Sequence, residues 1–524
     1  MGHDPSARHG TAKPAGSAPE HRLNRSFSLR SAFSLAFADV SPIVALYAIF
    51  ALGLFAAGPA FWWAFPVVLV GQLLVALVFG ELSSKWPFAG SVYQWARHVQ
   101  GTTWGWAAMW AYIWGLTIAL ATLSYGASGF LLQACGVTDP SRNTTIGVAL
   151  LILVAGSITN MVGRSVLKVM VVASIICEIV ASVGLSLVLL IFHRENSLSV
   201  LFDGFGTAGA GTWLTGPALA AMAYVGWSFV GFEAAGSIAE EVDKPERNVP
   251  RAIIWSLVCV AAIVMFSSAS LILAIPDLDT MMADQPGDPV TLTLTSQLGN
   301  AVGKPLLVMF VIGFLSSFLA VQAAVSRCIW GSARDHALPA PTFLGKLAGR
   351  ERLPVNAIAV TGVVAALLLL MSGSDFYGIL VNFTSMGFQI AFGIPVLGVA
   401  LARLRGRWQP GVFSLGRWGA PVTYAAAVWC VLQTVNIAWP RSSAGDTWYM
   451  RWSMVLTSAM LAVVGILIHT FVRGRIKGPL AGRLADIPEG PTTDSPAAGT
   501  AEPGPAGTAR PTSGSTTRND LENV

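Results

Sequence analysis

The sequence predicts an all-α polytopic membrane protein with about twelve transmembrane helices. Of its 524 residues, 54% are hydrophobic and only 11% are charged, and the mean hydropathy is +0.63. Apolar stretches of roughly 20 residues recur along the chain, and a helix of about that length crosses a hydrocarbon core of about 30 Å. This composition excludes a soluble globular protein.

The apolar stretches divide the chain into a membrane domain and two tails. Residues 28–473 form the predicted transmembrane domain. Residues 1–27 and 474–524 are rich in Gly, Pro, Ser, Thr and Ala, and we expect both to be disordered cytoplasmic tails. The spans are expected at 31–54, 61–82, 104–132, 145–161, 167–192, 214–239, 253–275, 306–331, 355–371, 378–404, 420–439 and 452–472.

The basic residues predict the orientation of these spans. If the first span starts in the cytoplasm, 27 of the 32 Lys and Arg residues lie inside. The outer segments hold Arg142, Arg194, Lys304, Arg441 and Arg451. We therefore expect a multi-pass protein of the plasma membrane with both termini in the cytoplasm.

Several classes of function are not supported by the sequence. The five cysteines are scattered singly, and no cluster of His, Cys and carboxylate residues suggests a metal site or a hydrolytic triad. No phosphate-binding loop of the G-x-x-x-x-G-K-[ST] type occurs, and basic and aromatic residues are not interleaved as in nucleic-acid binders. We expect neither an enzyme, a metal site, a primary pump nor a nucleic-acid partner.

The first span is interrupted near its middle by the stretch Asp-Val-Ser-Pro-Ile at 39–43. Ser41 is a favourable N-cap and Pro42 a favourable first residue for a helix that continues outward from this break. The amides of residues 43–45 would then face the bilayer centre, where they suit a carboxylate.

The sixth span contains a second interruption, Trp-Ser-Phe-Val-Gly-Phe-Glu at 227–233. An ionisable group at bilayer depth costs about 2.5–3.5 kcal/mol, so we expect Glu233 to face a cavity or a partner rather than lipid. The outer half-helix is expected to end near Ser228, which leaves carbonyls around residues 226, 227 and 229 without helical partners. These carbonyls suit an ammonium group.

Interrupted spans at corresponding positions of two halves indicate a transporter built from inverted repeats, with its substrate between the broken helices. Amides on one side and carbonyls on the other are complementary to a zwitterion, and an amino acid is the simplest such substrate.

Three stretches of the chain carry a resemblance to a known family, namely residues 80–87 with 90–96, residues 227–251, and Arg327 with residues 332–339. They resemble the amino acid, polyamine and organocation (APC) superfamily, in its amino acid permease branch. The similarity covers roughly residues 28–472. It implies a LeuT-like five-plus-five inverted repeat of twelve helices in which helices one and six are broken.

The resemblance also implies roles for individual residues. Ser41 and Ile43 would bind the substrate carboxylate through backbone groups, Trp227 and Val230 would offer carbonyls to its amino group, and the Trp227 ring would cover the site. In full, the predicted substrate-binding residues are Ser41, Pro42, Ile43, Val44, Gly226, Trp227, Phe229, Val230 and Gly231, and the predicted coupling or gating residues are Asp39, Glu178, Glu233, Glu81, Arg334 and Asp335.

Two features depart from the family pattern. Many relatives carry a glycine-rich break where this chain has Ser41-Pro42-Ile43. Glu178 lies at about the position where some proton-coupled relatives have a lysine. Its carboxyl group could take a proton, pair across helices or hydrogen-bond within the bundle.

Three other predictions keep an alternative. Asp39 either binds a cationic side chain or polyamine, or is a hydrogen-bonded structural residue. Glu233 either caps the first turn of the inner half-helix, or has a proton-sensing or gating role in transport. The predicted cytoplasmic gate network has an ordinary charged surface as its alternative. Its members are Glu81, Lys85, Arg327, Arg334, Asp335, Glu240 and Glu241.

We therefore expect a secondary transporter that moves an amino acid or related amine by alternating access, as a proton-coupled importer or as an exchanger. An amine or polyamine exchanger is the main alternative, and a channel or a nontransporting amine sensor are the others. Coupling to H+ or Na+ stays open, and no other cofactor is expected. The lipid bilayer and the small-molecule substrate are the expected partners, and the sequence predicts no oligomeric state.

Overall fold

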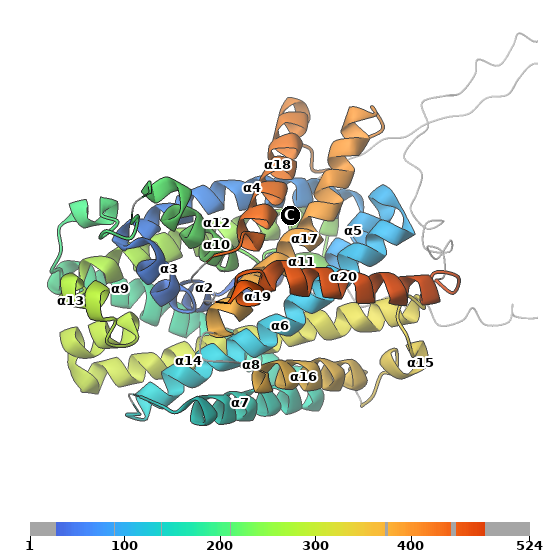
Figure 1. The fold of residues 1–524 in the computed structure, drawn as a ribbon. Helices are drawn as coiled ribbons and strands as arrows, with labels where there is room; N and C mark the ends of the chain where they lie inside the picture. The colour runs from blue at the N-terminus through green and yellow to red at the C-terminus, as the bar shows by residue number, and fades with distance from the viewer. Residues whose placement is uncertain are drawn as a thin grey trace, which may run out of the picture. The chain divides into compact units, whose positions relative to one another are not determined.

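The computed structural model describes residues 28–476, except 89, 138, 210, 350, 372–375 and 442–446. Within these residues the chain is built from helices, and an isolated bridge joins Ala348 and Leu353 (Figure 1). The predicted all-α membrane fold is thereby confirmed. The disorder predicted for 1–27 and for most of 474–524 lies outside the described residues.

The first predicted span is three consecutive helices, α1 (Leu29–Val40), α2 (Pro42–Tyr47) and α3 (Phe50–Ala57). Ser28 caps α1, because its hydroxyl oxygen accepts a hydrogen bond from the Ser31 amide at 3.3 Å. Between α1 and α2 the backbone of Ser41 has φ 47° and ψ 112°, far from helical values. The break predicted at 39–43 is therefore present.

The second to fifth spans follow with short connections. The fifth span contains a π-helical turn directly after Glu178, an irregularity that is frequent at functional sites. The elements of this part are η1 (Pro59–Trp63), α4 (Ala64–Lys85), α5 (Ser91–Gln100), α6 (Thr102–Ala134), α7 (Arg142–Val162), α8 (Arg164–Glu178), η2 (Ile179–Gly184) and α9 (Leu185–Phe192).

The sixth span is also broken. α10 (Pro217–Ser228) ends where the sequence predicted, residues 229–233 are not helical, and α11 (Ala234–Ser237) is a single turn. The outer loop before it holds η3 (Leu198–Phe202) and η4 (Trp213–Thr215), and η5 (Ala239–Glu241) follows it.

The remaining spans include the longest helix of the described chain. α14 starts before the predicted span 306–331 because Asp288 caps it, accepting the Thr291 amide at 2.8 Å. Gly299, at φ 70°, marks a kink inside it. The elements are α12 (Pro245–Leu273), α13 (Leu278–Asp284), α14 (Pro289–Arg334), α15 (Pro341–Leu344), α16 (Val355–Leu370), α17 (Phe376–Leu404), η6 (Gly416–Trp418), α18 (Gly419–Ala438), α19 (Trp448–Arg451) and α20 (Ser453–Val472).

The observed helices account for all twelve predicted spans. In the described part of the chain, ten helical runs are long and apolar enough to cross a membrane. The other two predicted spans correspond to the shorter apolar helix α16 and to the broken pair α10 and α11.

The long helices α6 and α14 lie side by side at the centre of the bundle (Figure 1). Within their most apolar windows, 78% of α6 and 72% of α14 is buried, against 11% of α20. α17 also packs on α6, and a Cβ added at Gly387 would lie 2.7 Å from the Gly115 Cα. Small residues thus let two central helices approach closely, as is typical of membrane bundles.

Candidate functional site

The first break is stabilised by its own serine. The Ser41 hydroxyl oxygen accepts the Val44 amide at 3.3 Å, which caps α2, and the Ser41 carbonyl accepts the Ala45 amide at 2.8 Å. Pro42 occupies the first helical position, where its missing amide hydrogen costs no hydrogen bond. The cap and the proline therefore form as the sequence predicted.

The carboxylate on this break comes from the chain itself. The Ser41 hydroxyl donates to Glu178 Oε1, and the Ile43 amide donates to Glu178 Oε2 at 2.8 Å. Glu178 and Ser41 are each 1% exposed. Of the three interpretations of Glu178, hydrogen bonding within the bundle is the one that the described contacts include. Of the amides predicted for a substrate carboxylate, that of Ile43 binds the carboxylate of Glu178, and those of Val44 and Ala45 donate to Ser41.

At the second break, Glu233 accepts two hydrogen bonds. The Gly231 amide donates to Oε2 at 3.1 Å, and the Tyr112 hydroxyl donates to Oε1 at 2.9 Å. Glu233 stands at the N-cap of α11, yet its side chain makes no capping hydrogen bond to that helix. Its carboxylate turns toward the freed Gly231 amide and toward Tyr112 of α6, and both interpretations of Glu233, as a cap of the inner half-helix and as a proton sensor or gate, stay predictions.

The two breaks touch each other. Gly231 has φ 101°, and a Cβ added there would lie 2.7 Å from Asp39 Oδ2 and 3.3 Å from the Val40 amide nitrogen. The Ser228 hydroxyl donates to the Ala45 carbonyl at 2.5 Å. Only glycine fits this close approach without strain. The structure thus brings together Asp39 and Gly231, from interruptions that are far apart in sequence.

The other predicted substrate-binding residues are buried around the same contact. Trp227 lies in the last turn of α10, and Phe229 and Val230 follow it in the break. Trp227 is 6% and Val230 7% exposed. Pro42, Val44 and Gly226 are also buried. Binding of a substrate by these residues stays a prediction.

Tyr112 is a site residue that the sequence reasoning missed. It lies within the predicted span 104–132, and a tyrosine hydroxyl buried in a membrane helix needs a hydrogen-bond partner. That requirement was the available signal, but it does not name Glu233 as the partner.

Comparison with known proteins decides the family. A family model described as "Amino acid permease" matches residues 27–471. The chain belongs to the amino acid permease family. This permease is thus a member of the APC superfamily, a multi-pass membrane protein and a secondary transporter of amino acids rather than an enzyme.

Relatives named as permeases or as a putative transporter align with most of the permease. A branched-chain amino acid permease of Lactococcus lactis is 27% identical, with 68% of this chain and 77% of the relative covered. Amino-acid permease 2 of Neurospora crassa is 23% identical, with 87% of each chain covered. A putative polyamine transporter of Candida albicans is 24% identical, with 87% of this chain and 86% of the relative covered.

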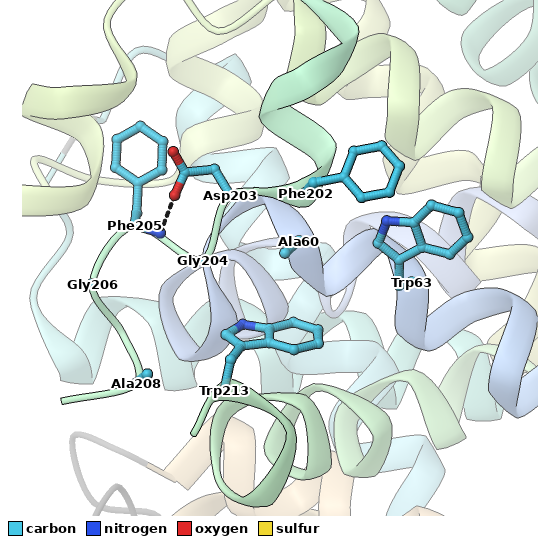
Figure 2. Close-up of a pocket in the computed structure, with 9 residues that line it drawn as sticks. All are labelled: Ala60, Trp63, Phe202, Asp203, Gly204, Phe205, Gly206, Ala208 and Trp213. Carbon is cyan, nitrogen blue, oxygen red and sulfur yellow. Dashed lines mark hydrogen bonds between the residues drawn. The ribbon is translucent and has the colours of Figure 1, made fainter. Parts of the chain in front are cut away.

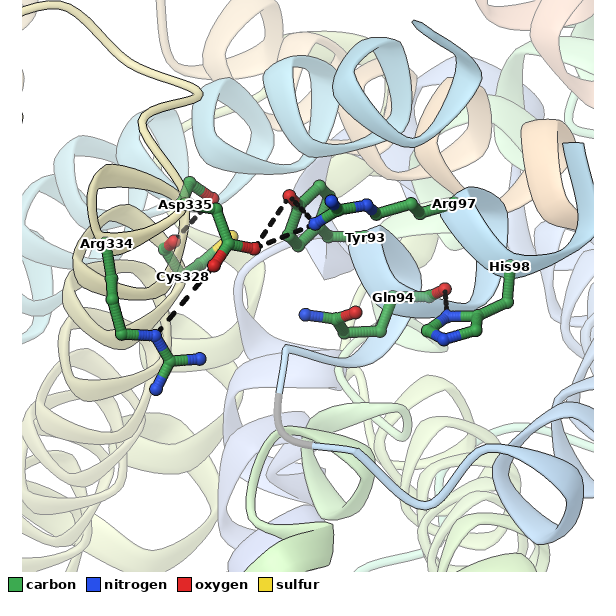
Figure 3. A network of polar contacts seen from close by, with 8 residues as sticks. Tyr93, Gln94, Arg97, His98, Cys328, Arg334 and Asp335 are labelled. Carbon is green, nitrogen blue, oxygen red and sulfur yellow. Dashed lines mark hydrogen bonds and ion pairs between the residues drawn. The ribbon is translucent and has the colours of Figure 1, made fainter. Parts of the chain in front are cut away.

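On the predicted inner side of the permease, Asp335 is held by α5. Arg97 Nη1 lies 2.9 Å from Asp335 Oδ2, and the Tyr93 hydroxyl donates to the same oxygen at 3.1 Å (Figure 3). Arg97 also donates to the Tyr93 hydroxyl at 2.9 Å, and burial raises the pKa of that phenol. Arg334 is more distant, with Nε 3.9 Å from Asp335 Oδ1.

Glu81 belongs to a different cluster. Its Oε2 accepts from Arg403 at the end of α17, and its Oε1 accepts the Leu415 amide at 3.0 Å. Arg403 Nε also donates to the Thr423 hydroxyl at 3.0 Å. The contacts described for Glu81 and for Asp335 do not share a residue, and one gate network that includes both acids stays a prediction. Neither Arg97 nor Arg403 was assigned to the network, because nothing local in the sequence pairs them with these acids.

The permease also has an aromatic cavity of about 390 Å³ in its predicted outer loops (Figure 2). The outer loop is tied down there, because Trp213 Nε1 donates to the Ala57 carbonyl at 2.8 Å and the Ala60 amide to the Asp203 carbonyl at 3.0 Å. None of its lining residues is a predicted site residue. They are Ala60, Trp63, Phe202, Asp203, Gly204, Phe205, Gly206, Ala208 and Trp213.

Proposed function

We propose that this permease carries its amino acid or related amine across the plasma membrane by alternating access, with the substrate bound between the two broken spans. The observation that carries the proposal is the contact between the breaks, where Gly231 lies against Asp39 and Val40. Backbone groups freed by two interruptions at the same depth form a polar site that a continuous helix cannot offer. Both termini are proposed to lie in the cytoplasm.

The inner clusters support a gated pathway. Asp335 joins α14 to α5 through Arg97, and Glu81 joins α4 to α17 through Arg403. Both ion pairs are largely buried, with side-chain exposure of 6% and 12% in the first and 13% and 1% in the second. Removing one partner of a buried ion pair leaves an uncompensated charge, which is costly. We therefore expect both pairs to separate together when the inner side of the pathway opens.

We propose Glu178 as the coupling residue, with a proton as the coupled ion. Its carboxyl oxygens accept hydrogen bonds from Ser41 and Ile43 and so connect α8 to the first break. The titratable groups beside it are Tyr47 of α2 and Cys177 of α8. Protonation of the carboxylate would weaken both hydrogen bonds to the break and free α2 to move.

Exchange of an amine or polyamine is the second candidate. The relative from Candida albicans is a putative polyamine transporter that covers 87% of this chain. This similarity matches that of the amino acid permeases in extent, so both substrate classes belong in the same experiment.

The test is counterflow of labelled amino acids and amines into proteoliposomes, with Trp227→Ala as the site variant. Trp255→Ala is the matched control, because Trp255 is 60% exposed on the surface of α12. We expect saturable counterflow that falls at least tenfold in Trp227→Ala and stays within twofold in the control. Currents without saturation would indicate a channel, and binding without counterflow would indicate a sensor.

A further inference from the structure

The hydrogen-bond donors of the first break are already taken. The Ser41 hydroxyl and the Ile43 amide donate to Glu178. The next two amides, of Val44 and Ala45, donate to Ser41 Oγ and to its carbonyl. A ligand that reaches this break therefore meets no donor that lacks an acceptor, and its own carboxylate would have to displace that of Glu178.

An acceptor beside the break is unused. Asp39, in the last turn of α1, is 8% exposed, and its Oδ1 is buried without a hydrogen-bond partner in the described structure. Glu233, on the other side of Gly231, has a donor on each carboxylate oxygen. Asp39 is thus the carboxylate at the contact of the two breaks that still needs a donor.

No ion pair between two described residues includes Asp39. Such pairs join Arg97 and Arg334 to Asp335, and Arg403 to Glu81, all at the predicted inner ends of their helices. A buried carboxylate without a donor or a positive charge is unfavourable. A ligand with N–H donors and a positive charge would satisfy both requirements, whereas an anion would add a further negative charge.

We propose that this permease recognises its ligand through a cationic amine bound by Asp39, and that the ligand needs no carboxylate because Glu178 already occupies that position. This inference rests on the proposed site between the breaks and narrows its substrate class. Amines without a carboxyl group are then ligands in their own right, and amino acids bind with the added cost of displacing Glu178.

Matched pairs of ligands test the proposal. Lysine is compared with cadaverine, and leucine with isopentylamine, because each pair differs only by the carboxyl group. Dissociation constants are measured from the dependence of the thermal stability of the purified full-length protein on ligand concentration. Labelled forms of the same four compounds are tested by counterflow. We expect each amine to bind within threefold of its parent amino acid, or more tightly.

Two variants separate the roles of the carboxylates. Asp39→Asn keeps the shape but removes the charge, and we expect it to weaken all four ligands at least tenfold. Glu178→Gln removes the charged competitor, and we expect it to strengthen lysine and leucine about tenfold while the two amines change less than twofold. Asp279→Asn, at an exposed position of α13, is the control and should leave all four constants unchanged.

The outcomes distinguish this inference from the proposed function. A wild-type protein that binds lysine and leucine but neither amine overturns the inference alone, as does an Asp39→Asn protein with unchanged constants. A wild-type protein that binds none of the four and moves none in counterflow overturns the proposed site as well. The Glu178→Gln arm remains decisive if Asp39→Asn does not fold, because equal weakening of amines and amino acids would contradict the displacement.

Discussion

Gly231 is the residue at which the two interrupted spans meet. Its φ of 101° and the proximity of Asp39 Oδ2 to the position of a Cβ leave no room for a side chain. The same glycine donates its amide to Glu233 at 3.1 Å. One small residue therefore binds the carboxylate of Glu233 and lies beside that of Asp39.

We predict that Gly231→Ala lowers both stability and uptake. A non-glycine residue at this φ costs about 1–3 kcal/mol, and the added Cβ would displace Asp39. Gly129→Ala is the control, because a Cβ there meets nothing within 4 Å inside helix α6. Thermal unfolding in detergent and counterflow measure the two effects. Equal behaviour of the two variants would show that the breaks do not need this approach.

The buried pair Arg97–Asp335 gives a second prediction at the scale of single residues. Arg97→Gln leaves Asp335 without its close cation, and breaking a buried pair costs about 3–5 kcal/mol. Arg334→Gln is the matched control, because Arg334 is 36% exposed and 3.9 Å away, and such contacts contribute about 0–1 kcal/mol. Unfolding in detergent compares the two. A cost in Arg334→Gln as large as that in Arg97→Gln would contradict the assignment.

At the scale of the helix, the Ser41 side chain has two structural roles. Its side chain caps α2 through the Val44 amide and donates to Glu178 on α8. A π-helical turn follows Glu178 directly in the fifth span. The break in the first span is thus stabilised from within and also tied to a neighbouring helix.

Ser41→Ala should therefore be more costly than an ordinary serine substitution in a membrane helix. A hydrogen bond to a charged group contributes about 1.5–3 kcal/mol, and the cap is lost as well. Ser124→Ala in α6 is the comparison, because the Ser124 hydroxyl only donates to the Leu120 carbonyl of its own helix at 2.8 Å. We expect thermal unfolding to show a clear difference, and uptake by Ser41→Ala to lose much of its pH dependence. Equal stability of both variants would argue against a stabilising hydrogen bond between Ser41 and Glu178.

At the scale of the whole molecule, the orientation of the bundle can be tested with a native cysteine. Cys135 at the end of α6 is exposed, Cys177, Cys328 and Cys430 are buried, and Cys259 is intermediate. The charge pattern predicts that the end of α6 lies outside the cell.

We predict that a membrane-impermeant maleimide labels the permease on intact cells and that Cys135→Ser abolishes this labelling. Cys430→Ser, which removes a buried thiol, is the control and should leave it unchanged. Proteases added outside should not remove a tag placed at either terminus of intact cells. Labelling of Cys135 only after the cells are opened would reverse the proposed topology.

Local pattern was enough to predict the spans and both interruptions. Length and hydropathy of each apolar stretch identify a membrane helix, and Ser41-Pro42 and Gly231 each interrupt one within the chain segment itself. The N-cap at Ser41 and the end of α10 at Ser228 were predictable for the same reason, since capping depends on residues within one turn.

The partners of the buried charges were decided by tertiary structure alone. Glu178 meets Ile43 across 135 residues, and Arg403 meets Glu81 across 322. A membrane helix that is apolar on every side carries little periodic signal to show which face turns inward. Its rotation, and with it the choice of partner for each carboxylate, is set only when neighbouring helices pack. The sequence by itself therefore determined where the chain crosses the membrane and where it breaks, and the packed bundle decided which groups meet there.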